Sequence, residues 1–257
     1  MMKFGINTFL FVSPFTTKSV TLFKKIKAWG FDSVELAIED PSHIDAVKVK
    51  AALDRNNLTC CSICGAFGPD RDLRGNATQQ KTSIKYMKGL IDAMVDLDCP
   101  ALIGPVYSAV GRADQETAKD RQAQFRTIVK NLKEICKYAE DRGKVICLEP
   151  LNRFETDCVN TVDQALKIVK AVKSPALKIH LDSFHMNIEE KNQSEALLKA
   201  GSLLGHFHAC GSDRGTPGSD HIDWKGIAAA MKKLKYDGAV VIESFTPDVK
   251  VIAKAAS

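Results

Sequence analysis

Eight short runs of apolar and β-branched residues alternate along the chain with stretches that have the apolar spacing of amphipathic helices. Two of the helical stretches, 20–30 and 125–143, end in a glycine, which is a common helix stop. Regular alternation of strand and helix implies a parallel sheet, and eight units favour its closure into a barrel. We therefore expect an α/β fold, a single (β/α)8 TIM-barrel domain over residues 1–257, with strands at 4–10, 33–38, 59–67, 101–106, 144–150, 177–182, 204–210 and 239–245.

The two ends of the sequence bear on this expectation. The apolar stretch after Lys3 resembles the core of a signal peptide, but no small-residue cleavage site follows it cleanly, so we interpret it as the first strand. After the eighth run, residues 246–257 contain the segment VKVIAKAAS, which has the pattern of a helix at its start. We expect the eighth helix to be missing or short. A doubly wound open sheet is the main alternative, but no G-x-G-x-x-G or P-loop motif follows any run.

Composition narrows the class of protein. The net charge is +5, and the Lys clusters lie in separate segments with helical spacing, so we interpret them as solvated helix faces and expect no nucleic acid as a partner. No uncharged apolar run reaches about 20 residues, so we expect no membrane span. Most of the eight cysteines fall inside apolar runs, where cysteine behaves as a small buried hydrophobe. We expect reduced structural thiols, including the Cys61–Cys64 pair, in a cytoplasmic protein. We also expect the protein to be a homodimer or homotetramer.

The last four predicted strands each end in a side chain that can bind a metal: Glu149, Asp182, His208 and Glu243. The carboxyl ends of barrel strands form the active site, and the two-residue period of a strand places Val145, Cys147 and Glu149 on one face. Three carboxylates that converge on one barrel mouth would repel each other unless a cation lies between them. Three oxygen donors and one imidazole suit a hard or borderline divalent metal, Mn²⁺ first, with Co²⁺ or Mg²⁺ as alternatives.

Two further histidines lie two residues before metal-competent positions. His206 precedes His208 and His180 precedes Asp182, so each side chain points inward one layer deeper. We expect both to be core residues or groups that support the metal ligands, and not ligands themselves.

Three long segments carry a family resemblance: LEPLNRFE (148–155), LDSFHMNIEE (181–190) and GHFHACGSDR (205–214). Together with VIESF (241–245) they resemble the ketose 3-epimerases, the family of D-tagatose, D-allulose (D-psicose) and L-ribulose 3-epimerases. The resemblance is strongest in the second half of the chain. The first four units are matched mainly by their pattern.

The resemblance implies an isomerase that epimerises free ketoses at C3 with a divalent metal. Pairs of this kind include D-fructose and D-allulose, D-tagatose and D-sorbose, and L-ribulose and L-xylulose. The residues that match the family's ligands are Glu149, Asp182, His208 and Glu243, of which Glu149 and Glu243 also exchange the C3 proton. The family's contacts to the O1–O3 end of the sugar fall on Glu155, His185 and Arg214. A base on one face and an acid on the other would invert C3, and a metal acting as a Lewis acid would stabilise the enediolate.

Some features depart from the family or leave alternatives open. Family members commonly carry a glutamate near position 211, where this chain has Gly211. We expect selectivity for the C4–C6 end of the sugar to come from loop residues around Phe9, Cys64–Phe67 and Tyr107. The alternatives are an aldose–ketose isomerase on the same barrel and a non-catalytic sugar-binding barrel. A multi-zinc endonuclease barrel has little support, since it needs more histidines at the strand ends.

Overall fold

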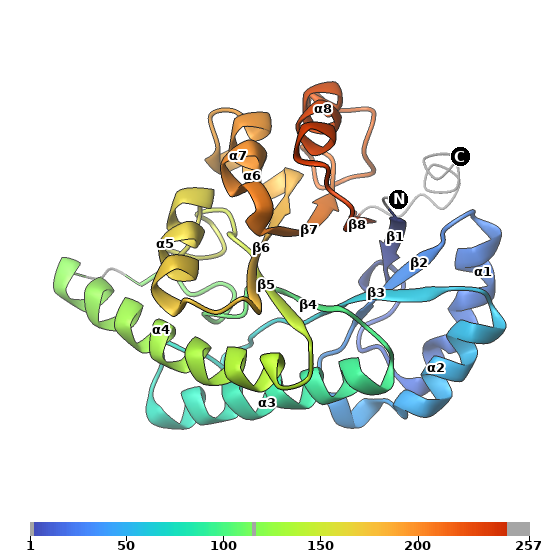
Figure 1. Cartoon of the computed structure of the whole chain (residues 1–257), viewed down its shortest axis with the longest axis horizontal. Helices are drawn as coiled ribbons and strands as arrows, with labels where there is room; N and C mark the ends of the chain where they lie inside the picture. The colour runs from blue at the N-terminus through green and yellow to red at the C-terminus, as the bar shows by residue number, and fades with distance from the viewer. Residues whose placement is uncertain (1–2, 115–116, 246–257) are drawn as a thin grey trace.

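The computed structural model describes residues 3–114 and 117–245, and within these ranges it forms a closed parallel barrel (Figure 1). The eight strands follow one another around the ring in chain order, and β1 pairs with β8 to close it. The expected barrel is thereby confirmed. The strands are β1 (Lys3–Asn7), β2 (Ser33–Ala37), β3 (Thr59–Cys64), β4 (Ala101–Gly104), β5 (Val145–Leu148), β6 (Leu177–Asp182), β7 (Leu204–Ala209) and β8 (Ala239–Ile242).

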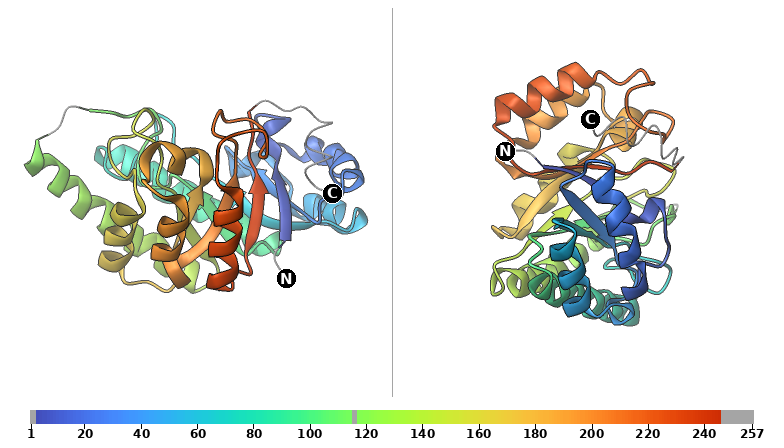
Figure 2. Two further views of the ribbon diagram at one scale, coloured as in Figure 1. Left: turned by 90° about the horizontal axis from the view of Figure 1, so that it is seen from above. Right: turned by 90° about the vertical axis from the view of Figure 1, so that its right-hand side faces the viewer.

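Helices surround the strands on the outside, as the two turned views also show (Figure 2). The α-helices are α1 (Phe23–Ala28), α2 (Ala46–Arg55), α3 (Ala77–Asp96), α4 (Ala118–Glu140), α5 (Val162–Val172), α6 (Ser183–Glu189), α7 (Gln193–Ala200) and α8 (Trp224–Leu234). Short 3-10 helices lie at Thr8–Leu10, Thr17–Leu22, Pro41–His43 and Gly201–Leu203. The expected shortage of an eighth covering helix falls on residues 246–257, outside the described part of the chain.

The helix starts follow local capping chemistry. Asn76, Thr117 and Thr161 each accept a hydrogen bond from the third helical residue of α3, α4 and α5, where a Gln or Asp side chain bonds back to the cap. Such reciprocal capping satisfies two amide hydrogens that have no partner within the helix. The cap at Thr117 makes α4 begin seven residues before the predicted start at 125, and the helix ends near Gly143 as expected.

Three predicted strands are too long by three residues at their carboxyl ends: the first, the third, which ends at Cys64 instead of residue 67, and the eighth. The first run was expected to reach residue 10, but β1 ends at Asn7 because the Asn7 side chain accepts from the Phe9 amide and starts a 3-10 turn. The last run ends at Ile242 instead of 245. Glu149 and Glu243 consequently lie one residue beyond β5 and β8, at the mouth of the barrel.

Two register shifts set which residues face each other inside the barrel. In β3 the extra residue is Cys61, so that Glu35 on β2 pairs with Ser62. In β7 the extra residue is Gly205, so that His180 pairs with His206 and Asp182 pairs with His208. A Cβ on Gly205 would lie 2.7 Å from the Cys147 sulfur, so only glycine fits there without movement. The shifts bring the polar residues of neighbouring strands to the same height.

Apolar residues fill two regions. A large core lies between the strands and the helices, and a smaller cluster of Ala101, Ile103 and Cys147 packs with Cys64 and Val145. Strand alternation places this smaller cluster inside the barrel below Glu149, as the sequence predicted. All eight cysteines have free thiols, and six of them are buried.

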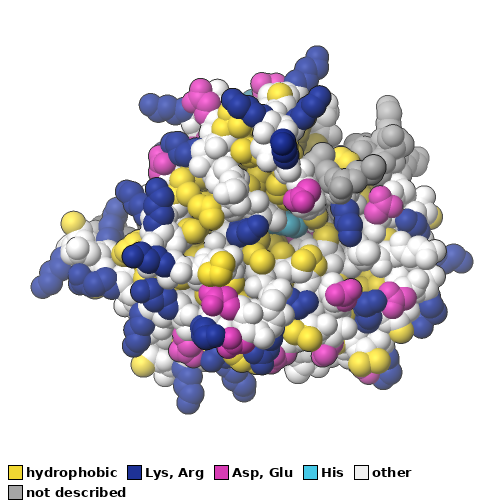
Figure 3. Space-filling model, viewed as in Figure 1, with side chains coloured by type: hydrophobic (Ala, Val, Ile, Leu, Met, Phe, Trp, Pro, Cys, Tyr) yellow, Lys and Arg dark blue, Asp and Glu magenta, His cyan; other side chains and the backbone are white. Residues whose placement is uncertain are grey.

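The surface bears on the expected partners. Lys and Arg side chains are spread around the face shown in Figure 3 and do not gather into one patch. Among the described residues, no helix is both long and apolar enough to cross a membrane.

Candidate metal centre and sugar site

Three of the four predicted metal-binding residues form one buried cluster at the mouth of the barrel. Glu149, Asp182 and His208 each offer an oxygen or nitrogen atom, and these atoms all lie within 4.8 Å of one another. Glu243 adjoins the cluster, with its Oε2 atom 3.3 Å from His208 Nδ1. All four residues are at most 9% exposed. The structure therefore brings together the four residues that the sequence singled out.

The free atoms of this cluster fit a cation. Asp182 Oδ1 accepts a hydrogen bond from the Phe184 amide, whereas Asp182 Oδ2 is buried and has no hydrogen-bond partner among the described residues. His208 Nδ1 is unpartnered in the same sense, and it lies 3.9 Å from Asp182 Oδ2. Buried polar atoms without partners are rare in native proteins, and an ion accounts for them. Oxygen atoms with one imidazole nitrogen are a donor set that divalent metals accept.

The protonation of the cluster reflects its crowding. Burial raises the pKa of Glu149 well above its ordinary value, and the charges of Glu243 and Asp182 add to the effect. Burial likewise raises the pKa of Asp182 to about 7, although His208 opposes the shift. Burial lowers the pKa of His208, but the charges of Glu35 and Glu243 outweigh it, and the net pKa lies well above normal. Without a cation the cluster therefore keeps protons, which a metal would displace.

A fifth carboxylate, Glu35 on β2, was missed by the sequence analysis. It is completely buried, and its Oε1 lies 2.8 Å from His208 Nε2. Its Oε2 lies 2.9 Å from His206 Nε2 and accepts from the Ser62 hydroxyl. Burial raises the pKa of Glu35, but the two histidines outweigh it and hold that pKa well below its usual range. A carboxylate that accepts from one imidazole nitrogen leaves the other free for a metal.

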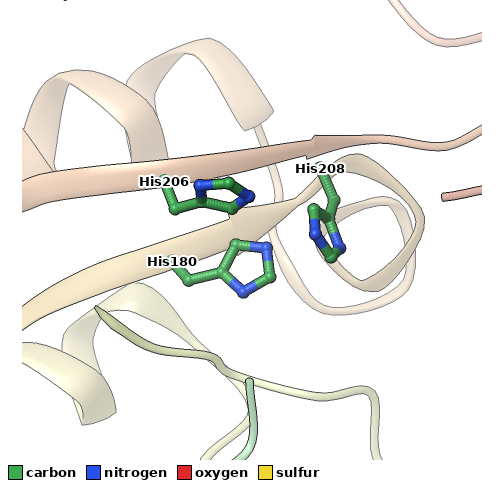
Figure 4. Close-up of side chains that lie close together, drawn as sticks. All are labelled: His180, His206 and His208. Atoms are coloured by element: carbon green, nitrogen blue, oxygen red, sulfur yellow. The ribbon is translucent and has the colours of Figure 1, made fainter. Parts of the chain in front are cut away.

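The two deeper histidines lie beneath this cluster, as expected. His180 and His206 project from neighbouring strands, β6 and β7, with ring centroids 5.0 Å apart (Figure 4). The His208 ring is 4.1 Å from that of His180. His180 Nδ1 lies 3.6 Å from Glu149 Oε2, so this ring adjoins a predicted ligand without a hydrogen bond to it.

The three predicted sugar-contacting residues lie beside the cluster and are joined by Asn152. Arg214 donates to Glu155 at 2.7 Å, and Asn152 also donates to Glu155, at 2.8 Å. The Asn152 amide donates to His185 Nδ1 at 3.1 Å. His185 is therefore a neutral ring that carries its hydrogen on Nε2, consistent with burial lowering its pKa well below normal. That Nε2 lies 3.9 Å from Glu149 Oε1.

Aromatic rings fix the position of Arg214. Its guanidinium lies 4.8 Å from the Phe184 ring and 4.4 Å from the Phe245 ring. Its backbone has a positive φ of 63°, and its carbonyl accepts from the Phe245 amide at 2.8 Å. The arginine is thus held from both ends, with its charge directed at Glu155.

The expected selectivity residues divide into two groups. Phe67 and Tyr107 are buried in the core, and the Tyr107 hydroxyl donates to the Val159 carbonyl, so these two side chains expose almost no surface to a ligand. Phe9 is 40% exposed, and its ring packs edge-on against that of Phe245, with the ring centroids 5.6 Å apart. Phe9 thus retains surface that a ligand can reach.

The comparisons with known proteins agree with this geometry. A family model described as "Xylose isomerase-like TIM barrel" matches residues 23–257. A "Probable ketose 3-epimerase" of Synechocystis sp. is 34% identical, over 99% of this chain and 88% of the relative. A "D-psicose 3-epimerase" of Ruminiclostridium cellulolyticum is 32% identical, over 95% of this chain and 84% of the relative.

Solved structures give the same result. The crystal structure of a D-allulose 3-epimerase from Methylomonas sp. superposes with a TM-score of 0.89 at 27% identity, over 95% of this chain and 85% of that one. A D-psicose 3-epimerase with D-tagatose from Clostridium cellulolyticum H10 has a TM-score of 0.87 at 29% identity, over 98% of this chain and 89% of that one. The chain therefore belongs to the xylose isomerase-like TIM-barrel family and, within it, to the ketose 3-epimerases, isomerases that act on carbohydrates.

Proposed function

We propose that this protein epimerises free ketoses at C3, using Glu149 and Glu243 as a pair of proton-exchanging groups. The observation that carries the proposal is the position of these two carboxylates at the same barrel mouth, just beyond β5 and β8, with Asp182 and His208 on the strands between them. Two carboxylates on separated strands can flank a flat intermediate, which inversion at C3 requires.

The four side chains Glu149, Asp182, His208 and Glu243 would hold one divalent metal, and Mn²⁺ suits this donor set, with Co²⁺ or Mg²⁺ as alternatives. When bound, the metal supplies a Lewis acid that polarises the ketose carbonyl and favours loss of the neighbouring proton. The unpartnered Asp182 Oδ2 and His208 Nδ1 atoms support this placement.

The proton transfers are the work of the two glutamates. The C3–H bond breaks, its proton passes to one carboxylate, and the electron pair moves toward the C2 carbonyl oxygen as a C2–C3 double bond forms. The other carboxylate then delivers a proton to the opposite face of C3, and the electron pair returns to form that bond.

The neighbouring polar groups orient the sugar. His185 presents an N–H at Nε2, 3.9 Å from Glu149 Oε1, and can donate to a sugar oxygen held there. Arg214 and Glu155 form a hydrogen-bonded pair and offer a donor and an acceptor to the O1–O3 end of the sugar. Fixing the sugar in this way would place C3 between the two glutamates.

The substrates we propose are D-fructose and D-allulose, D-tagatose and D-sorbose, and L-ribulose and L-xylulose. A ketose bound to relatives, such as D-tagatose in the D-psicose 3-epimerase structure or D-allulose in the Methylomonas enzyme, supports this class. We further propose that residues 1–257 form a single domain and that the protein is a cytoplasmic homodimer or homotetramer.

The test is product analysis. The protein is incubated with Mn²⁺ and D-fructose, D-tagatose or L-ribulose, and ketoses and aldoses are resolved by chromatography. We expect the C3 epimer of at least one ketose. An aldose product would instead indicate an aldose–ketose isomerase, and binding of a ketose without any product would indicate a sugar-binding barrel.

The Glu243→Gln variant tests the mechanism in the same assay. We expect it to lose at least about 1,000-fold in kcat, as removal of a group that acts in the transition state does, while sugar binding measured by calorimetry persists. Near wild-type turnover by this variant would refute the two-carboxylate mechanism.

A further inference from the structure

Asn7, on β1, is completely buried, and its side-chain amide bridges two carboxylates from opposite neighbouring strands. The Nδ2 atom donates to Glu35 Oε1 at 2.8 Å and to Glu243 Oε1 at 2.8 Å. Its Oδ1 atom accepts from the Phe9 amide at 2.8 Å. Every polar group of the amide is engaged, and the backbone N–H identifies which end is the oxygen, so its orientation is fixed.

This bridge determines how the Glu243 carboxylate is turned. Glu243 Oε1 is held by Asn7, which leaves Oε2 facing the cluster, 3.3 Å from His208 Nδ1. Glu35 links Asn7 to His208. Its Oε1 atom accepts from Asn7 Nδ2 and also lies 2.8 Å from His208 Nε2. Rotation of Glu243 about its terminal bond would break the bond to Asn7.

Glu149 has different neighbours. Its oxygens lie 3.6 Å from His180 Nδ1 and 3.9 Å from His185 Nε2, whereas the side-chain bonds of Asn7 go to Glu35, Glu243 and the Phe9 amide. The two glutamates therefore have separate surroundings. A change at Asn7 acts on one of them.

We propose that Asn7 is a positioning residue for Glu243, and that it controls proton exchange on one face of C3. The inference rests on the proposed two-glutamate epimerisation. Each epimer gives up its C3 proton to a different glutamate. A misplaced Glu243 therefore changes how the intermediate divides between return and product for one starting epimer and not for the other. A merely structural asparagine would leave this division the same for both epimers.

The test measures deuterium at C3 in D₂O, starting separately from each epimer. In the Asn7→Asp variant the acceptor toward Phe9 is kept, but two donated hydrogens are replaced by an oxygen facing two carboxylates. When the starting epimer is the one whose proton goes to Glu149, the intermediate still forms. Glu149, after exchange with solvent, then returns deuterium to the same face of C3 before Glu243 can complete the inversion. We expect the ratio of deuterium in recovered starting ketose to product formed to rise about tenfold for that epimer only, with kcat falling about 10–100-fold and KM nearly unchanged.

The Glu243→Gln and Glu149→Gln variants identify which epimer belongs to which glutamate. We expect Asn7→Asp to share its affected epimer with Glu243→Gln. Asn131→Asp is the matched control, since Asn131 is also a buried asparagine whose amide donates to two acceptors, and it lies on α4. That control is expected to change stability without changing the exchange ratio of either epimer.

Equal exchange ratios for both epimers in Asn7→Asp, or the pattern of Glu149→Gln, would overturn the proposal. Asn7→Ala, which removes the donor without adding an oxygen, gives the same comparison if the aspartate variant does not fold. Calorimetry with Mn²⁺ alone gives a second readout: we expect its affinity to fall about tenfold or more in Asn7→Asp and to stay unchanged in Asn131→Asp. A wild-type protein that binds Mn²⁺ but epimerises no ketose would contradict the proposed function, and the calorimetric comparison would still decide the role of Asn7.

Discussion

Glu35 shows how a full charge is kept inside a barrel. The carboxylate has no exposed surface, yet Asn7, Ser62, His206 and His208 all lie within hydrogen-bonding distance of its oxygens. A buried charge is tolerated when it is paired and hydrogen-bonded, and removing one partner is costly. Glu35 is therefore joined to the candidate metal centre without belonging to the set of ligands that the sequence predicted.

Replacing Glu35 with Gln tests this link. The amide is neutral and presents an N–H group where His208 Nε2 needs an acceptor, so the imidazole no longer holds its Nδ1 lone pair toward Asp182 and Glu243. We expect Mn²⁺ affinity, measured by calorimetry, to fall about 10–100-fold. The free energy of unfolding, measured in urea, should fall by about 3 kcal/mol. Glu39→Gln, four residues later and exposed, is the control; unchanged metal affinity in Glu35→Gln would show that the contact to His208 does not matter.

Individual residue contacts were also the part of the structure that the sequence predicted least completely. Glu149, Asp182, His208 and Glu243 could be predicted because each ends a strand-like run, a position that specifies one end of a barrel. Glu35 lies within the run SVELAI and Asn7 within FGINTFL, and strand period alone gives their face but not their partners. A charged residue inside an apolar run was the available signal. The contacts join residues 28 to 236 positions apart, which only the closed fold brings together.

At the scale of the elements, the register shift in β7 decides where His208 points. The extra residue, Gly205, lets Asp182 pair with His208. Sequence alternation placed both side chains inward, but it gave no indication of the shift, because a bulge depends on close approach of neighbouring strands. The lack of room beside the Cys147 sulfur is a property of the assembled barrel.

Gly205→Ala should therefore disturb both the barrel and the metal site. A Cβ would lie 2.7 Å from Cys147 Sγ and 2.9 Å from Lys178 Cβ, so the strands must move. We expect a loss of about 1–3 kcal/mol in urea unfolding, typical of overpacking, and a parallel loss of Mn²⁺ affinity. The double variant Gly205→Ala with Cys147→Ala should recover part of the stability, because it removes the nearer of the two contacts. A single variant as stable as wild type would mean that the strands adapt freely.

An ion pair joins the loop that carries Glu155 to the helix that carries His185. Arg153 donates to Glu189 through its backbone amide and through its side chain at 2.7, 2.9 and 3.0 Å. Burial raises the pKa of Glu189, but the bonds from Arg153 outweigh it, so the net pKa lies below the ordinary value. A lowered carboxyl pKa stabilises the fold above the unfolded value and loses that effect as pH falls.

Glu189→Gln should consequently be a pH-dependent change. At pH 7 we expect unfolding to cost about 1 kcal/mol less than in wild type, a modest amount because Arg153 is 62% exposed and solvent screens the pair. The difference should shrink as pH falls from about 4.3, the ordinary glutamate value, through the lowered native pKa. Asp54→Asn, in the exposed pair with Lys50 on α2, should change stability less at every pH. A difference that grows in acid would contradict the sign of the shift.

At the scale of the whole molecule, the alternation of eight runs with helical stretches was enough to predict the barrel. Runs such as 101–106 are apolar on both faces, as is typical of a parallel sheet covered by helices. Strand ends were harder. β1 stops at Asn7, whose side chain caps a 3-10 turn, and β8 ends at Ile242, three residues before the predicted end. The enzyme class came from long motifs and not from the alternation, since one barrel supports many reactions.

Metal removal should act on the stability of the entire barrel. Four buried donors, on β6 and β7 and just beyond β5 and β8, would be joined by the ion, which binds the native state and not the unfolded chain. At a metal concentration 100 times the dissociation constant, the linkage amounts to about 2.7 kcal/mol, so we expect Mn²⁺ to raise the Tm of chelator-treated protein by about 5–10 °C. Asp182→Asn should reduce this rise. Equal Tm values with and without Mn²⁺, in calorimetric scans, would contradict the metal site.

The seam between β1 and β8 has a consequence for when the protein becomes active. Asn7 stands on the first strand of the ring and Glu243 just past the last, and their bond crosses the one strand pair that joins the two ends of the ring. In a newly made chain, β8 must be synthesised and must dock against β1 before this bond can form. Epimerase activity measured during refolding should thus report ring closure. We expect no activity while only seven strands have docked, and activity once β8 has paired with β1.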